Sequence, residues 1–500
     1  MSTNFDKLTP EDFRFADPER VIHDKKLEAK PVGYFKDALR RFKRNKASIV
    51  AAFIILFLIL FAIVVPMFSK YSMSFSDPVY RNRIPKSEAL SKIGIMTGTY
   101  TKQLNGKGYE NFRAVGVGAS YDRATDTEDL SQGIGGAYSP LREAAEPDFE
   151  RYYYAKVDAY YEIGFQNLLI TQEEYADILD YEAETGMCVL YPVVDASLPG
   201  VFDASDPNWW YQTDERGYAV LDAQGNFIDR YLRDDNGKPV YSVNRDRNSL
   251  MVRVLYHNYF VFKNGTAPGF FFGTNNVGQD ILVRLAMAIR LSMILALGVS
   301  VINLVLGAVY GAVEGYYGGR TDLVMQRITD ILSGVPFIIV ATLFQLHLAN
   351  SAGVVPSLLF AFVLTGWIGT ANRVRTQFYR FKNQEYVLAA RTLGARDRRL
   401  MFKHIFPNTL GTIITSSVLV IPNVIFSESM LSYLGIVNLS GSQMTSIGAM
   451  LSDGQAIMSA YPHVILFPAI VISLLMISFN LFGNGLRDAF NPSLRGGDES

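Results

Sequence analysis

The feature that most constrains this chain is a set of long apolar runs that flank one long polar segment. The first run, Ala47–Phe68, holds no charged residue. As a helix rising about 1.5 Å per residue it crosses the ~30 Å hydrocarbon core of a bilayer. Five more candidate spans follow, at Leu285–Val313, Ile331–Ala349, Val354–Ala371, Leu410–Ser427 and Val464–Phe482. The third is the weakest, because Pro336, Gln345 and His347 interrupt it. The pattern predicts an all-α membrane protein with six transmembrane helices.

The polar segment, residues 69–268, is called the insert below. Its length of roughly 200 residues is enough for a domain with its own core. Glu173–Thr185 has the composition of a helix, and Tyr218–Val243 reads as strands joined by Gln-Gly-Asn and Asp-Asn-Gly turns. The one cysteine, Cys188, excludes an intramolecular disulfide, so packing must hold this segment together. We expect an α+β domain between the first and second spans.

Charge is distributed unevenly, and this gives an orientation. Residues 69–265 carry 20 Lys and Arg against 29 Asp and Glu, whereas the rest of the chain carries 27 against 19. Basic residues cluster at Lys36–Lys46 and at Arg373–Lys403. The positive-inside rule then predicts cytoplasmic termini and an extracellular insert. The expected layout is a cytoplasmic tail 1–46, a first helix 47–68, the insert 69–268, a membrane core 269–490 with a cytoplasmic loop 380–407, and a cytoplasmic tail 491–500.

The loop between the fourth and fifth spans combines small, basic and helix-breaking residues. Ala389 and Ala390 let a helix lie close to a partner surface. Gly394 permits a backbone turn that other residues resist, and Pro407 suits the first turn of the next helix. These residues fit a contact surface for a partner protein. They also fit an ordinary basic loop, and composition alone leaves both interpretations open.

The spacing in this loop resembles the coupling loop of ABC importer permeases, which reads Glu-Ala-Ala-x3-Gly-x9-Ile-x-Leu-Pro. Leu388, His404 and Phe406 stand at the glutamate, isoleucine and leucine positions of that pattern. Glu385 supplies an acidic residue three positions earlier, as is common in the oligopeptide and dipeptide branch. The departure at Leu388 bears on the strength of the contact with the ATPase.

Other segments resemble the same branch in order and spacing. They are Phe272–Asp280 with Gln279 at the usual arginine position, Gly315–Asp322, Glu428–Gly435, Gly483–Pro492 and residues 30–68. The chain is thus similar to the C-type permease subunit of bacterial oligopeptide or dipeptide ABC importers. The insert departs from the compact family pattern, and the resemblance says nothing about it.

The resemblance implies a subunit that moves peptides inward by alternating access and leaves ATP hydrolysis to partner chains. Its implied partners are a second permease, two ATP-binding subunits, an extracytoplasmic substrate-binding lipoprotein and the peptide itself, in a bacterial cell membrane and without nucleic acid. The residues implied to contact the ATPase are Glu385, Leu388, Ala389, Ala390, Gly394 and Pro407. The chain has no Gly-x4-Gly-Lys-Ser/Thr phosphate loop, and its five scattered histidines give no metal-ligand spacing. We expect no enzyme activity and no cofactor bound by this chain, with ATP and Mg²⁺ on the partners.

Polar groups within the spans are candidates for the translocation pathway, because such groups are costly in a membrane. They are Asn303, Gln345, Asn423, Glu428 and Asn480. Each could instead make a hydrogen bond between helices. In the insert, Trp209, Trp210 and Tyr211 are candidates for docking a binding protein, since aromatic residues favour interfaces. They could equally pack the insert's core, and the insert could be a cap on the partner permease.

Two other classes of function compete with the importer. A membrane-anchored sensor or receptor would display the insert as a ligand-binding ectodomain, but it usually carries a recognisable cytoplasmic output module, and the cytoplasmic parts here are short. A membrane-embedded enzyme needs a catalytic group, and the sequence shows no spacing of residues that is typical of a nucleophile and its base.

Overall fold

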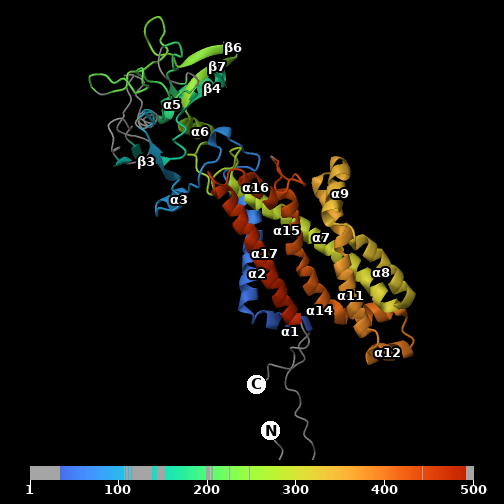
Figure 1. Cartoon of the computed structure of the whole chain (residues 1–500). Coiled ribbons are helices and arrows are strands. Elements are labelled where there is room, and N and C mark those ends of the chain that lie inside the picture. Colours follow the sequence, from blue (N-terminus) through green and yellow to red (C-terminus); the bar gives the residue numbers. More distant parts are fainter. Residues whose placement is uncertain are drawn as a thin grey trace, which may run out of the picture.

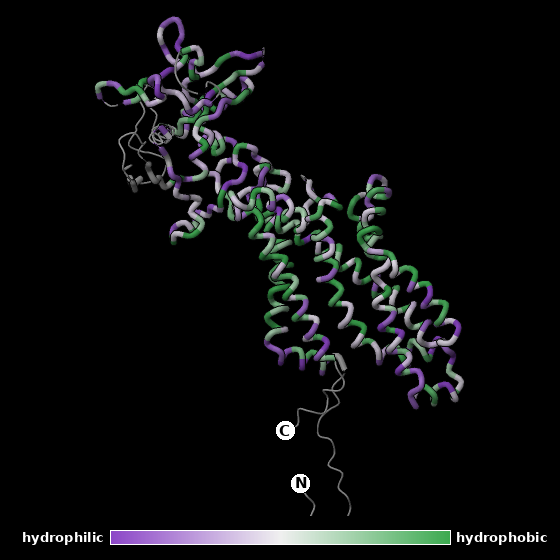
Figure 2. Tube along the Cα trace, in the orientation of Figure 1, coloured by the Kyte–Doolittle hydropathy of each residue, from purple (hydrophilic) through white to green (hydrophobic). Residues whose placement is uncertain are grey.

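We describe the protein from a computed structural model. The structure describes residues 34–490 except 106, 109–110, 112–113, 115–137, 143–151, 199–202, 204–205, 225, 247 and 442. The predicted C-terminal tail 491–500 and most of the N-terminal tail lie outside the described residues. A bundle of helices forms one part of the molecule, and the insert lies beyond one end of it (Figure 1). Hydrophobic residues dominate the bundle, while the insert mixes polar and apolar residues (Figure 2).

Among the described residues, five helical segments are long and apolar enough to cross a membrane. They are α2 (Lys46–Phe68), α7 (Ile281–Tyr317), α10–α11 (Val354–Gly366 and Ile368–Phe381), α13–α15 (Asp397–Tyr433) and α17 (His463–Phe490). A sixth span results if α8 (Gly319–Ser333) and α9 (Phe337–Ala352) are counted as one, although a 73° bend separates them. Five of the six predicted spans therefore fall on helices of the required length and apolarity.

The third predicted span, Ile331–Ala349, is not one straight helix. Helix α8 ends at Ser333, and α9 begins at Phe337 after Pro336. Proline has no N–H to continue a helix, and it disfavours a helical conformation in the residue before it. The break therefore falls at Pro336, one of the residues that made this candidate span the weakest of the six.

Helices α7 and α11 cross in close contact. Gly307, Gly311 and Gly315 lie one turn apart on α7 and face the backbone of α11. A Cβ atom at Gly311 would lie 2.2 Å from the carbonyl oxygen of Ala371, so no larger residue fits without moving a helix. Small residues at four-residue spacing allow this approach in membrane helices. The contact holds the end of α7 against the segment that leads into the predicted coupling loop.

The insert contains two antiparallel sheets. β1 (Thr99–Leu104), β3 (Tyr152–Asp158) and β2 (Tyr138–Arg142) form the first sheet in that order. β4 (Phe165–Thr171), β7 (Ser249–Leu255) and β5 (Leu190–Tyr191) form the second, and β6 (Ser242–Asp246) also pairs with β7. Its helical segments include η3 (Pro78–Tyr80), α3 (Glu88–Ser91), α5 (Gln172–Thr185) and α6 (Tyr256–Asn264). Strands and helices thus occur together, as an α+β domain requires.

The predicted helix of the insert is confirmed, whereas the predicted strands are only partly present. Helix α5 covers the predicted segment and begins at Gln172, directly after Thr171, whose side chain caps it by accepting a hydrogen bond from the Glu174 N–H. Between 213 and 239 the chain forms isolated bridges, not continuous strands. The turns at Asp214 and Asp234 close through hydrogen bonds from later backbone N–H groups to the aspartate side chain. These local bonds compete with ladder pairing and keep each bridge short.

The insert leaves and rejoins the bundle through two paired segments. Backbone N–H groups of Asp77 and Lys86 donate to the carbonyl oxygens of Gly278 and Phe270, at 3.1 and 2.9 Å. Residues 77–86 and 270–278 therefore form a collar at the base of the insert, and this pairing runs past the predicted insert boundary at residue 268. Helix α7 starts directly after the collar, and the Asp280 side chain caps it by accepting from Leu282 N at 3.0 Å. Burial raises the pKa of Asp280 to about 7.

Candidate functional site

The predicted coupling segment forms a short helix, α12 (Glu385–Thr392), at the end of the bundle opposite the insert (Figure 1). Glu385, Leu388 and Ala389 are exposed, and their spacing places them on one face. Ala390 is half-buried. The next residue after the helix's C-terminal turn, Leu393, is 88% exposed. Exposed leucines on so small a helix form a surface suited to a protein partner.

The opposite face of α12 anchors it to the bundle. Val387 is fully buried and packs with Phe378, Leu400 and Ile405 in one apolar cluster. Gly394 has a φ of +82°, a conformation that glycine adopts without strain, and it reverses the chain after the helix. The Ala395 N–H donates back to the Ala390 carbonyl oxygen at 3.1 Å and closes this turn. The helix is thus held by one apolar side chain and one glycine turn.

The next helix starts through a wider turn. Residues Leu400–Ile405 form a π-helix, η5, which runs into α14 (Phe406–Val418). Pro407 lies in the first turn of α14, where its missing N–H costs no hydrogen bond. The sequence predicted this place for Pro407. Pro407 is exposed, like Gly394 and the outer face of α12.

A polar network connects the coupling segment to the end of α7. The Tyr316 hydroxyl donates to the Asp397 carboxylate at 2.6 Å and accepts from Arg391 at 3.4 Å. The Lys382 ammonium donates to the Gly315 carbonyl oxygen at 3.0 Å, and burial lowers the pKa of this lysine. Sequence reasoning missed Tyr316 and Asp397 because the two residues lie 81 positions apart.

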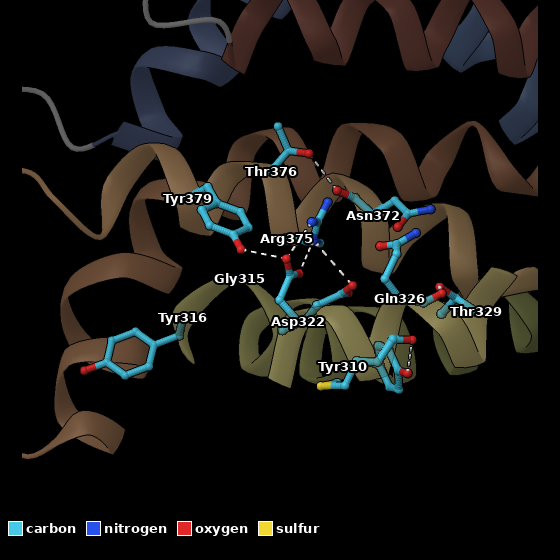
Figure 3. Close-up of polar contacts among 12 residues, drawn as sticks. Tyr310, Gly315, Tyr316, Asp322, Gln326, Thr329, Asn372, Arg375, Thr376 and Tyr379 are labelled. Carbon is cyan, nitrogen blue, oxygen red and sulfur yellow. Dashed lines mark hydrogen bonds and ion pairs between the residues drawn. The ribbon is translucent and has the colours of Figure 1, made fainter. Parts of the chain in front are cut away.

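An ion pair holds α8 against α11 next to this network. Arg375 donates through two nitrogens to Asp322, at 2.5 and 2.8 Å, and the Tyr379 hydroxyl donates to the same carboxylate at 2.8 Å (Figure 3). The buried Glu314 carboxylate lies 3.4 Å from the Arg375 Nε. A bidentate arginine pair fixes both distance and orientation. The ends of α7, α8 and α11 next to the predicted coupling segment are therefore connected by polar contacts.

Three of the five pathway candidates are engaged inside the bundle. Asn303 is buried, and its side chain packs against Gly366. Gln345 donates to the Val354 carbonyl oxygen at 3.1 Å and to the Ser357 hydroxyl at 2.6 Å. Glu428 is 1% exposed and accepts from Ser292 at 2.9 Å and Ser432 at 3.0 Å. Gln345 thus joins α9 to α10. Glu428 joins α15 to α7 and also bonds to the next turn of its own helix.

The other two candidates, Asn423 and Asn480, are exposed. Asn480 donates to the carbonyl oxygen of Met476 in its own helix at 2.8 Å, which leaves its side-chain oxygen facing outward. Asn423 lies on α15 (Val420–Tyr433), which continues from α14. The structure thus separates the five candidates: Asn303 and Glu428 are buried, Gln345 is half-buried, and Asn423 and Asn480 are exposed.

The aromatic docking candidates of the insert lie mostly in its core. Trp210 and Tyr211 are 4% and 1% exposed and pack with Phe227 and Tyr231. The Trp210 indole N–H donates to the Ala114 carbonyl oxygen at 3.1 Å. Trp209 is half-buried against Tyr211. Trp210 and Tyr211 therefore offer no surface to a partner in this conformation, because burying aromatic area stabilises the insert itself.

The sequence matches two models of known protein families. The family model for inner membrane components of binding-protein-dependent transport systems matches residues 303–496. The model for the N-terminal transmembrane domain of oligopeptide transport permease C matches residues 33–85. The second match covers α2 and nearly all of the first collar segment, residues 77–86. The second collar segment, residues 270–278, lies before the start of the first match. Most of the insert lies outside both matches.

Individual relatives agree with the family models. The oligopeptide transport system permease protein OppC of Bacillus subtilis (strain 168) is 42% identical over 224 residues, which are 45% of this chain and 72% of the relative. The dipeptide transport system permease protein DppC of the same organism is 40% identical over 227 residues, 45% of this chain and 69% of the relative. A solved inward-facing structure of the MetNI methionine ABC transporter covers 42% of this chain and 96% of its own at 13% identity and a TM-score of 0.36. A likeness that weak supports no conclusion.

These relatives are transport permeases, and none of those named here is a sensor or an enzyme. Permeases of this family work with ATPase subunits and a substrate-binding subunit. The exposed helix α12 lies within the matched region. The chain therefore belongs to the family of binding-protein-dependent transport system inner membrane components, as a permease subunit of an ABC importer.

Proposed function

We propose that this permease carries oligopeptides or dipeptides inward, together with a second permease and two ATP-binding subunits. The observation that carries the proposal is the identity of 42% and 40% to an oligopeptide and a dipeptide permease, over 224 and 227 residues. Nickel complexes and glycosides are the competing solutes, since related importers carry them.

Reconstitution of the complete complex in liposomes tests the substrate. ATP-dependent accumulation of a labelled tripeptide is the expected result, and a complex with an ATPase-dead partner subunit is the control. Accumulation of a nickel complex or a glycoside, with no peptide uptake, would contradict the assignment.

Helix α12 is proposed to contact the ATPase through Glu385, Leu388, Ala389 and the following turn at Gly394, with Ala390 and Pro407 supporting them. Its support is the combination of an exposed apolar face and a buried anchor at Val387. Closure of the ATPase pair on ATP would pull on α12. The network through Tyr316 and Asp397 then transmits that pull to α7.

The proposed orientation puts both termini and α12 in the cytoplasm and the insert outside. It rests on the charge difference between the insert and the remainder. A cysteine placed at the exposed Asn236, in a Cys188→Ser background, should react with a membrane-impermeant maleimide in whole cells. A cysteine placed at the exposed Thr392 should react only after lysis. The reverse pattern would invert the topology.

The insert is proposed to receive the substrate-binding lipoprotein, or to act as a lid over the pathway. It joins the bundle directly above α7, and it is acidic. The contact must use exposed side chains, since Trp210 and Tyr211 are buried. A cap that touches only the partner permease is the alternative.

Replacing residues 88–268 by a short Gly/Ser linker tests this role and keeps the collar, because Lys86 and Phe270 already pair. Loss of uptake driven by the binding protein, with an intact complex, is the expected result. Uptake at the parental rate and apparent affinity would refute the docking role.

A further inference from the structure

Four helices of the bundle expose polar side chains where α2 and α7 expose apolar ones. From Val50 to Phe68 of α2, and from Ile281 to Val309 of α7, every exposed residue is apolar. The exposed polar residues are Arg373, Thr376 and Arg380 on α11, Asn408 and Thr412 on α14, Asn423 on α15, and Ser473, Asn480, Asn484, Arg487 and Asp488 on α17. Hydrocarbon cannot solvate such groups, so this face borders water or protein in the assembled importer.

Helical spacing places the two exposed asparagines on this same face. Asn480 and Arg487 are seven residues apart on α17, which is two turns, so their side chains point the same way. Thr412 and Asn423 are eleven residues apart along the α14–α15 segment, close to three turns. The polar face therefore runs along the helices and ends at the α12 end of the bundle.

At that end the polar face opens into a cavity of about 340 Å³ between α11, α14 and α17. Arg373 and Arg380 line it from α11, and Arg487 lines it from α17. Hydroxyl residues of α14 form its floor: Thr412, Thr415 and Ser416. None of the described residues that line the cavity is acidic.

The three arginines are not engaged by acidic groups of the described chain. Arg375, on the other side of α11, pairs with Asp322, whereas Arg373, Arg380 and Arg487 form no ion pair with any described residue. Thr415 and Ser416 donate to the Thr412 carbonyl oxygen, at 3.0 and 2.9 Å, which leaves the guanidinium groups as the principal donors. Guanidinium groups bind carboxylates through two parallel hydrogen bonds.

We propose that this arginine pocket is an anion site on the release side of the pathway, and that it takes the carboxylate of the solute. The inference rests on the proposed peptide function, because a peptide carries a carboxylate at its C-terminus. Continuity with Asn423 and Asn480 favours a solute over a lipid, since a lipid headgroup would be followed by apolar residues along the helices. The pocket would draw the solute toward the cytoplasm while the complex is open inward.

Binding to the nucleotide-free complex in zwitterionic nanodiscs, without the binding protein, tests the proposal. The probes are N-acetyl-trialanine, which carries one negative charge, and its neutral C-terminal amide. Calorimetry or saturation-transfer NMR should show about tenfold tighter binding of the acid. Arg373→Gln, Arg380→Gln and Arg487→Gln combined should abolish the preference. The three Lys replacements should keep part of it, and Arg320→Gln, at an exposed arginine outside the pocket, should keep all of it.

Three results would overturn the proposal. One is equal affinity of the parent for acid and amide, and another is an unchanged preference in the triple variant. The third is an anionic lipid that co-purifies with the parent and not with the triple variant, without any preference for the acid; this would assign the pocket to a lipid headgroup. If the reconstituted importer carries no peptide at all, the substrate assignment fails. The pocket is then judged separately, by acetate binding to the parent and the triple variant.

Discussion

Helix α12 and the insert differ in the exposure of their apolar side chains. Leu388 in α12 and Leu393 directly after it are 42% and 88% exposed. In the insert the aromatic pair Trp210 and Tyr211 is almost fully buried. Both segments contain residues that favour interfaces, so residue type alone does not identify a contact surface. The comparison shows that a contact surface requires exposed side chains. Their exposure depends on how much of the surrounding chain packs against the segment.

Size explains the difference. Helix α12 has eight residues and one buried anchor, so half of its surface has nothing of its own chain to pack against. The insert has two sheets and several helices, and its aromatic residues gather in clusters between them. A short helix at the end of a membrane bundle therefore retains apolar surface that a domain of the insert's size would bury.

The sharpest test of the comparison exchanges one leucine for arginine in each region. Leu388 on α12 and Leu221 in the insert are 42% and 44% exposed. Leu388→Arg should lower peptide uptake and stimulation of the ATPase by about tenfold or more, because it puts a bulky charge, of opposite sign to the glutamate of the family pattern, in the proposed contact with the ATPase. Leu221→Arg should leave both within about twofold of the parent. Equal effects of the two substitutions would remove the distinction between the regions.

Burial of Trp210 predicts a large effect on the stability of the insert. Trp210→Ala should lower the free energy of unfolding by about 3–5 kcal/mol, since it empties a packed site and removes a buried hydrogen bond. Trp209→Ala, at a half-buried position, should cost clearly less. Thermal unfolding of the full chain followed by tryptophan fluorescence measures both. A larger loss for Trp209 than for Trp210 would be evidence against the core described here.

The insert should also lose stability in mild acid. The ring of His257 stacks on that of Tyr161, with the two centroids 3.8 Å apart. Burial lowers the pKa of His257 from 6.5 to about 4. The unfolded chain therefore binds the proton first. Stability should fall as the pH drops from about 6.5 to 4, by up to about 3 kcal/mol. His257→Gln should flatten that part of the profile, and an unchanged slope in the variant would assign it to other groups.

Hydropathy was sufficient to predict five spans, and a proline located the break in the remaining one. Which polar residues face outward could not be predicted, because it depends on neighbours far along the chain. Asn303 is buried by Gly366, and Glu428 by serines of α7 and α15. Asn423 and Asn480 lie on faces that no described helix covers. The burial of Trp210 likewise depends on Phe227 and Tyr231, which pack against it from the bridge region.

The smallest expected effect concerns the attachment of α12 to the bundle. It tests whether the polar network contributes to this attachment in addition to the buried Val387. The Tyr316 hydroxyl joins α7 to Asp397 and Arg391. Tyr316→Phe keeps the ring and removes only this link, which is worth about 1 kcal/mol. We expect the number of peptides carried per ATP to fall about twofold, and amide hydrogen exchange in α12 to speed up. Tyr317→Phe is the matched control, since its ring is 55% exposed. If the two variants behave alike, Val387 alone holds α12, and the polar network plays no part in coupling.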